Sequence, residues 1–288
     1  MKKTIFDTGP LEFSGASLSG GAAKPAAAAV LGIALALTMI LSASGCRGAG
    51  PSSGQVLETP YAVTDDAGNA REYRLFLPGK KGRVPLMLYF HGVISPGFKK
   101  IPSLRDYTGS PVEETGLIPF CREHGIALLV PKALYEYTFL KCRSTGWLTV
   151  KEIDGVEKII DTVIEHYPVD RDGIYLAGIS AGAVFSHYLA NRRPSLYNAV
   201  LSHSQAYVDP DGVVLPPAEK GPRFGVVFCY NEGDYKNLIA FCIESERLYR
   251  EAGYRTVLLK DVPPRGHAWS SSNNARFWKL LRSLGQRP

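Results

Sequence analysis

Short apolar runs alternate with amphipathic segments along most of the chain. Runs typical of buried strands lie at residues 84–90, 126–130, 174–179, 199–202, 224–230 and 256–259. Helices are predicted between and after them, at 118–124, 150–166, 181–191, 238–252 and 275–284. The helix at 150–166 has apolar residues at helical spacing with charges between them, which is typical of a surface helix packed on a sheet. Strands that alternate with helices predict a mostly parallel sheet with helices on both faces.

Three segments depart from this alternation. Residues 57–64 and 72–77 flank a cluster of turn formers, which predicts an antiparallel hairpin ahead of the parallel strands. The aromatic-rich stretch 133–147 has neither helical nor strand period and is predicted to be a long loop. Only about twenty residues join the strands at 199–202 and 224–230, so we expect a minimal cap and an open site.

A serine lies at the break between one predicted strand and the following helix. The sequence Gly178-Ile179-Ser180-Ala181-Gly182 has glycine two positions before and two after the serine, where strand and helix must approach closely. Such a turn pushes the hydroxyl out above the sheet and points the amide of Ala181 at the atom that the hydroxyl attacks. Ser180 is therefore the predicted nucleophile, and a Gly/Ser-rich turn without chemistry is the alternative.

A serine nucleophile needs a base that takes its proton and an acid that orients the base. His267 lies in a loop between the last strand and the last helix, and it is the predicted base. His203, at the end of a strand, is the alternative base. Asp234, in the turn after the strand at 224–230, is the predicted acid. Glu232 and Asp261 are the alternative acids.

The remaining site residues are predicted from glycine and aromatic positions. Gly92 follows the strand at 84–90, and its missing side chain leaves room for an oxyanion near backbone amides, so amides at Gly92 and Val93 are predicted to join that of Ala181. Tyr135, Trp147 and Trp269 are candidate substrate contacts, although large aromatic side chains more often serve core packing.

Five motifs together resemble a known family. They are Phe90-His91-Gly92, the lead-in 170–175, the serine turn, Gly233-Asp234 and Gly266-His267-Ala268-Trp269. From about Arg71 to the end, the chain is similar to secreted α/β-hydrolase esterases of the feruloyl esterase and polyhydroxybutyrate depolymerase type. The resemblance implies hydrolysis of carboxylic esters through an acyl-enzyme at Ser180, without a cofactor. The open site and aromatic residues such as Tyr135, Trp147 and Trp269 suggest polysaccharide-linked or polymeric esters as substrates.

The N-terminal region predicts export. An unbroken run of small and apolar residues at 26–41 is typical of a signal-peptide core, and the small residues before Cys46 resemble the cleavage site of a bacterial lipoprotein. We therefore predict a signal at 1–46 with lipid on Cys46, a flexible tether at 47–56 and a catalytic domain at 57–288. An uncleaved membrane helix is the alternative. Either form places the domain outside the cytoplasm, in the cell envelope or secreted.

The net charge and the cysteines bear on the predicted partners and disulfides. The net charge of +6 is spread without a basic run, and no nucleic-acid motif accompanies it, so no nucleic-acid partner is predicted. No His/Cys spacing suggests a metal site. An oxidising compartment favours disulfides, and Cys121 with Cys142 and Cys229 with Cys242 are the predicted pairs, with buried thiols as the alternative.

Two other functions fit the same fold. A prolyl-oligopeptidase-like peptidase shares the order serine, acid, histidine, but the chain has no sequence for a separate gating domain. A cell-surface binding domain with an inactive triad is the third interpretation. The sequence leaves the acyl group, the alcohol and the oligomeric state open.

Overall fold

The computed structural model describes residues 58–93, 112–139, 142–209, 212–260 and 266–286. The predicted signal, Cys46 and the tether lie outside these residues. None of the helices in the described ranges has both the length and the apolar character needed to cross a bilayer. The described residues all belong to one compact unit, Ser53–Pro288.

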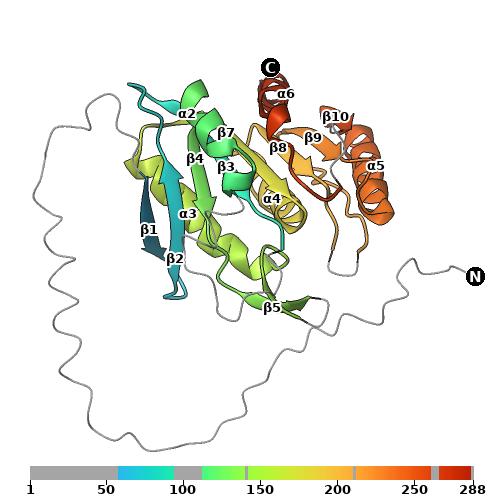
Figure 1. Ribbon diagram of the computed structural model, residues 1–288, viewed down its shortest axis with the longest axis horizontal. Coiled ribbons are helices and arrows are strands. Elements are labelled where there is room, and N and C mark those ends of the chain that lie inside the picture. Colours follow the sequence, from blue (N-terminus) through green and yellow to red (C-terminus); the bar gives the residue numbers. More distant parts are fainter. Residues whose placement is uncertain (1–57, 94–111, 140–141, 210–211, 261–265, 287–288) are drawn as a thin grey trace, which may run out of the picture. The chain divides into compact units, whose positions relative to one another are not determined.

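Eight strands form the main sheet in the order β1-β2-β4-β3-β7-β8-β9-β10 (Figure 1). Their bounds are β1 Glu58–Thr64, β2 Ala70–Phe76, β3 Val84–Phe90, β4 Ala127–Pro131, β7 Val169–Ile179, β8 Ala199–His203, β9 Gly225–Tyr230 and β10 Thr256–Lys260. The first two pair antiparallel, and β2 pairs antiparallel with β4. From β4 to β10 every pairing is parallel. The predicted hairpin and mostly parallel sheet are confirmed.

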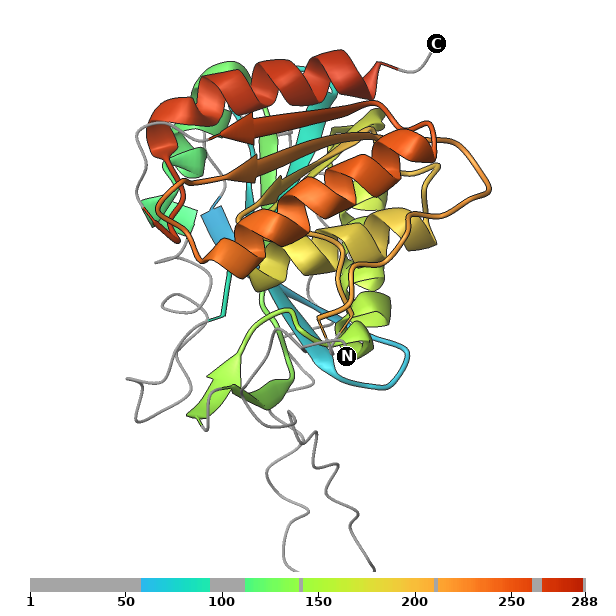
Figure 2. The same cartoon turned by 90° about the vertical axis from the view of Figure 1, so that its right-hand side faces the viewer.

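Helices cover both faces of this sheet because successive strand residues point to opposite sides. On one face, α3 (Ile153–His166), α4 (Ala181–Arg192) and α5 (Lys236–Glu251) pack on one core cluster. On the other face, α2 (Leu117–His124) and α6 (Asn274–Gly285) pack on a second cluster. Figure 2 shows α5 and α6 with strands β9 and β10 between them. Short 3₁₀ turns, η2 (Val150–Glu152) and η3 (Ser271–Asn273), precede α3 and α6.

Two segments differ from the prediction. The stretch 133–147 contains a small antiparallel pair, β5 (Glu136–Phe139) with β6 (Cys142–Thr145), rather than a continuous loop. Strand β7 begins at Val169, five residues before the strand predicted at 174–179. The register of the β3–β7 pairing shifts between Val84 and Leu86, and this irregularity accommodates the extra residues of β7. Both segments are too short or too irregular for a hydrophobic period to reveal them.

The disulfide prediction is wrong for the described cysteines, since Cys121, Cys229 and Cys242 are buried thiols. Cys229 packs in the cluster on the α6 face. Cys242 lies on α5, on the opposite face, and donates to the carbonyl of Gln205 at 3.4 Å. Because the sheet separates the two faces, these two sulfurs do not pair. The side chain of Cys142 lies outside the described residues.

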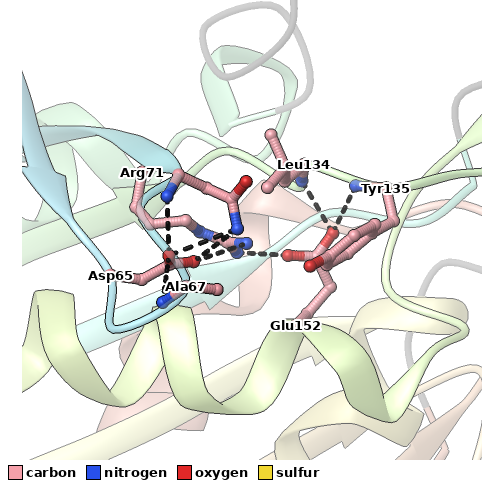
Figure 3. A network of polar contacts seen from close by, with 7 residues as sticks. Asp65, Ala67, Arg71, Leu134, Tyr135 and Glu152 are labelled. Atoms are coloured by element: carbon pink, nitrogen blue, oxygen red, sulfur yellow. Dashed lines mark hydrogen bonds and ion pairs between the residues drawn. The ribbon is translucent and has the colours of Figure 1, made fainter. Parts of the chain in front are cut away.

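A buried ion pair fixes the chain just before β5 (Figure 3). Arg71 of β2 and Glu152 at the start of α3 form an ion pair with both side chains 0% exposed. The second carboxylate oxygen of Glu152 accepts the backbone N–H groups of Leu134 at 2.6 Å and Tyr135 at 2.8 Å. Burial raises the pKa of Glu152, while Arg71 and the two amides oppose that shift. The network ties the edge hairpin, α3 and the segment around Tyr135 together.

Candidate active site

The serine turn has the strained geometry that the sequence predicts. Ser180 lies between β7 and α4 with φ 56° and ψ −124°, a left-handed φ that non-glycine residues rarely adopt. A side chain at Gly178 would place its Cβ 2.2 Å from the carbonyl oxygen of Gly182. A side chain at Gly182 would place its Cβ 2.1 Å from the carbonyl oxygen of Phe90. Only glycine fits these positions, so the two glycines let strand, helix and β3 meet at the serine.

Neighbouring strand ends hold this turn in place. The Ser180 backbone N–H donates to the carbonyl of His203, at the end of β8, at 2.9 Å. Gly92, just past the end of β3, lies beside the serine, because a Cβ built on Gly92 would be 3.2 Å from Ser180 Cβ and 3.8 Å from its Oγ. Ala181 is the first residue of α4, where backbone N–H groups have no partner within the helix. Val93 packs at the margin of the core.

The predicted acid and base meet in the structure. His267 Nδ1 lies 3.0 Å from Asp234 Oδ1, with the imidazole 30% exposed and the carboxylate 0% exposed. The two loops also touch through their backbones, since a Cβ on Gly233 would lie 3.2 Å from the Gly266 nitrogen. Asp234 follows β9, so its turn lies at the same carboxyl edge of the parallel sheet as Ser180 after β7.

Hydrogen bonds keep Asp234 ionised despite its burial. Burial alone would raise the pKa of this carboxyl group. Hydrogen bonds from the side chains of His267 and Ser204, and from the backbone N–H of Tyr235, outweigh burial and bring the pKa of Asp234 below its usual value. A carboxylate at neutral pH is what an orienting acid requires, because it holds the proton on the facing nitrogen of the imidazole.

The alternative base, His203, and the alternative acid Glu232 make contacts elsewhere in the fold. His203 is 0% exposed, its ring stacks on Trp269 at 5.2 Å between centroids, and its Nδ1 lies 2.9 Å from Ser204 Oγ. Glu232 forms an exposed ion pair with Lys260. Asp261 lies outside the described residues. The structure therefore brings His267 to Asp234 and leaves His203 in the core.

The predicted aromatic contacts divide into core and surface. Trp147 is 1% exposed and packs against Phe90 and Phe185, with 5.0 Å between ring centroids in both cases. Trp269 is 8% exposed, and its Nε1 donates to Asn274 Oδ1 at 2.9 Å. These two tryptophans thus pack in the core beneath the site, which corrects their assignment as substrate contacts. Tyr135 is half-buried on the segment that Glu152 fixes.

Two residues at the site were not predicted from the sequence. Tyr235 is 67% exposed, and its ring centroid lies 5.8 Å from that of His267. Asn231 is fully buried between the acid turn and the histidine loop. Their place next to Asp234 in the sequence was the available signal, but only the fold shows that both face the histidine loop.

Comparison with known proteins supports the esterase resemblance over part of the chain. Residues 123–213 match the family described as Esterase PHB depolymerase. A protein from Arabidopsis thaliana named Probable carboxylesterase 2 is 32% identical over 130 residues. That match covers 43% of this chain and 36% of the relative, so the chain spans little more than a third of that protein's length.

Solved structures define the class of fold. An S-formylglutathione hydrolase from Agrobacterium tumefaciens is 11% identical with a TM-score of 0.59, covering 83% of this chain and 98% of that chain. A ferulic acid esterase is 15% identical with a TM-score of 0.54, covering 80% of this chain and 98% of that chain. With its parallel sheet, serine turn and Asp–His pair, the chain has the α/β-hydrolase fold.

Proposed function

We propose that this chain is a serine hydrolase that cleaves carboxylic esters. The observation that carries the proposal is the strained Ser180 turn at the same sheet edge as the buried Asp234–His267 pair. The partial matches to an esterase family and to a carboxylesterase support the same class of reaction.

The proposed reaction has two steps. The nitrogen of His267 that does not face Asp234 takes the Ser180 proton as the hydroxyl oxygen attacks the ester carbonyl. The resulting oxyanion accepts hydrogen bonds from the amide of Ala181 and from amides at Gly92 and Val93, and the alcohol leaves with the proton from His267. Water then attacks the acyl-enzyme with the same base, which releases the acid and restores the serine.

We also propose that the protein works outside the cytoplasm, anchored by lipid on Cys46 or released. Its substrate is an ester on a polysaccharide or a polymer, in line with the resemblance to secreted esterases. The test is a panel of p-nitrophenyl esters of increasing acyl length, a feruloylated polysaccharide, a polyester film and an aminoacyl-proline anilide. Hydrolysis of esters supports the proposal. Turnover of the anilide alone would indicate a peptidase, and no turnover at all would indicate a binding domain.

Tyr235 is a proposed contact for the leaving alcohol, because its exposed ring lies beside the histidine that protonates that group. We expect Tyr235→Ala to raise KM for naphthyl esters between about twofold and tenfold, the range for one aromatic pair. Tyr235→Phe retains the ring and should match the wild type. Methyl esters with the same acyl group serve as the control. An equal change for methyl and naphthyl esters would contradict this role.

A further inference from the structure

One buried amide links the two loops that carry the acid and the base. Asn231 is the first residue after β9 and is 0% exposed. Its Nδ2 donates to the carbonyl of Gly266 at 2.7 Å and to the carbonyl of Ala268 at 2.9 Å. These two carbonyls flank His267, so both N–H groups of the amide are used on the backbone around the imidazole.

The same residue also closes the acid turn. The backbone carbonyl of Asn231 accepts the N–H of Asp234 at 3.1 Å. Asn231 therefore bonds to the turn of the acid through its backbone and to the loop of the base through its side chain. The distance between the Asp234 and His267 backbones depends on these contacts as well as on the single bond between the two side chains.

The histidine loop needs such support because it is a tight turn at the surface. Gly266 has φ 71°, and the Ala268 N–H bonds to the Gly266 carbonyl at 2.9 Å, which places His267 at the tip of a three-residue turn. The side chain of His267 itself is 30% exposed. Packing alone thus restrains the imidazole less than it restrains the buried carboxylate.

We propose that Asn231 is a positioning residue that holds His267 against Asp234 and in reach of Ser180. This inference rests on the proposed serine hydrolase function. Asn231 acts through the loop backbone and does not touch the reacting atoms. A shift of the imidazole by about 1 Å lowers the rate by up to about 100-fold, because proton transfer depends steeply on geometry.

The chain offers a matched control at the opposite edge of the sheet. Asn198, just before β8, is 7% exposed, and its Nδ2 also donates to two backbone carbonyls, those of Asp172 at 2.8 Å and Gly285 at 3.1 Å. Asn198→Ala therefore removes two bonds of the same kind at the start of β8, far from the serine turn. It also removes the bond that Asn198 Oδ1 accepts from the Ile174 N–H at 3.0 Å, so its loss of stability should be at least as large as that of Asn231→Ala. Asn231→Asp keeps the side-chain volume of Asn231 but removes both donors.

The experiment compares kcat, KM and the unfolding midpoint of Asn231→Ala, Asn231→Asp and Asn198→Ala at a temperature where all are folded. We expect both Asn231 variants to lose kcat by about 10- to 100-fold with KM little changed, while Asn198→Ala keeps kcat despite a loss of stability that is at least as large. Equal kcat in Asn231→Ala and Asn198→Ala would overturn the proposal.

A second readout does not depend on ester hydrolysis. The proton between His267 Nδ1 and Asp234 Oδ1 should give a low-field resonance that is missing in His267→Gln. We expect this resonance to be lost in Asn231→Ala and retained in Asn198→Ala. If the wild type hydrolyses no ester, the spectrum still tests the positioning role. A resonance that is unchanged in Asn231→Ala overturns this role, and loss of the resonance supports it.

Discussion

Ser180→Ala reduces ester hydrolysis roughly a million-fold, the loss that follows when the nucleophile of a serine triad is removed. Asp234 and His267 stay in place in this variant, but no oxygen remains to form the acyl-enzyme. The fold should be unaffected, since the alanine side chain occupies the same backbone turn with one atom fewer. Hydrolysis of p-nitrophenyl acetate and the thermal midpoint of the purified variant measure both effects.

The matched control for this variant is Ser245→Ala. Ser245 is a buried serine on α5, so its replacement also removes one hydroxyl group from the interior. We expect it to retain activity close to that of the wild type. If Ser180→Ala kept more than about one per cent of the activity, another residue would have to be the nucleophile.

The second large effect concerns stability. Glu152→Gln removes the nearer counter-ion of the fully buried Arg71 and leaves only the Asp65 carboxylate, 4.0 Å from the guanidinium. Breaking a buried pair costs about 3–5 kcal/mol of unfolding free energy, and we expect a loss toward the lower end of that range because Asp65 remains. Glutamine fills nearly the same volume and keeps an acceptor for the amides of Leu134 and Tyr135. The loss of unfolding free energy therefore measures the effect of removing the negative charge. Urea unfolding followed by tryptophan fluorescence measures it.

An exposed pair provides the comparison. Glu244 and Arg247 on α5 form an ion pair with side chains 45% and 44% exposed. We expect Glu244→Gln to change stability far less than Glu152→Gln, because water and salt screen the exposed charges. Similar losses in the two variants would show that the Arg71–Glu152 pair does not support the fold as described.

The parts of the fold that follow a simple rule were predictable from the sequence. The central strands β3, β4 and β9 are continuous apolar runs, and α3 is apolar on one face at helical spacing, so the hydrophobic pattern identifies them. The serine turn was predictable because sterics allow only glycine two residues either side of Ser180. Asp234 and His267 followed from chain order and turn chemistry, and the structure brings their side chains together.

The rest depended on packing in three dimensions. Spacing along the chain could not show that Cys229 and Cys242 lie on opposite faces of the sheet. Trp147 ends an aromatic-rich stretch of the sequence, yet only its contacts with Phe90 and Phe185 show that it belongs to the core. Asn231 bonds to a loop 35 residues away, a relation that no local pattern contains.

The central claim is that His267 and Asp234 activate Ser180, and covalent labelling tests it most directly. A fluorophosphonate reacts only with an activated serine, and peptide mass spectrometry locates the adduct. We expect a stoichiometric adduct on Ser180 in the wild type and labelling slower by several orders of magnitude in His267→Gln. A folded wild-type protein that stays unlabelled, or that is labelled equally fast without the imidazole, would contradict the claim.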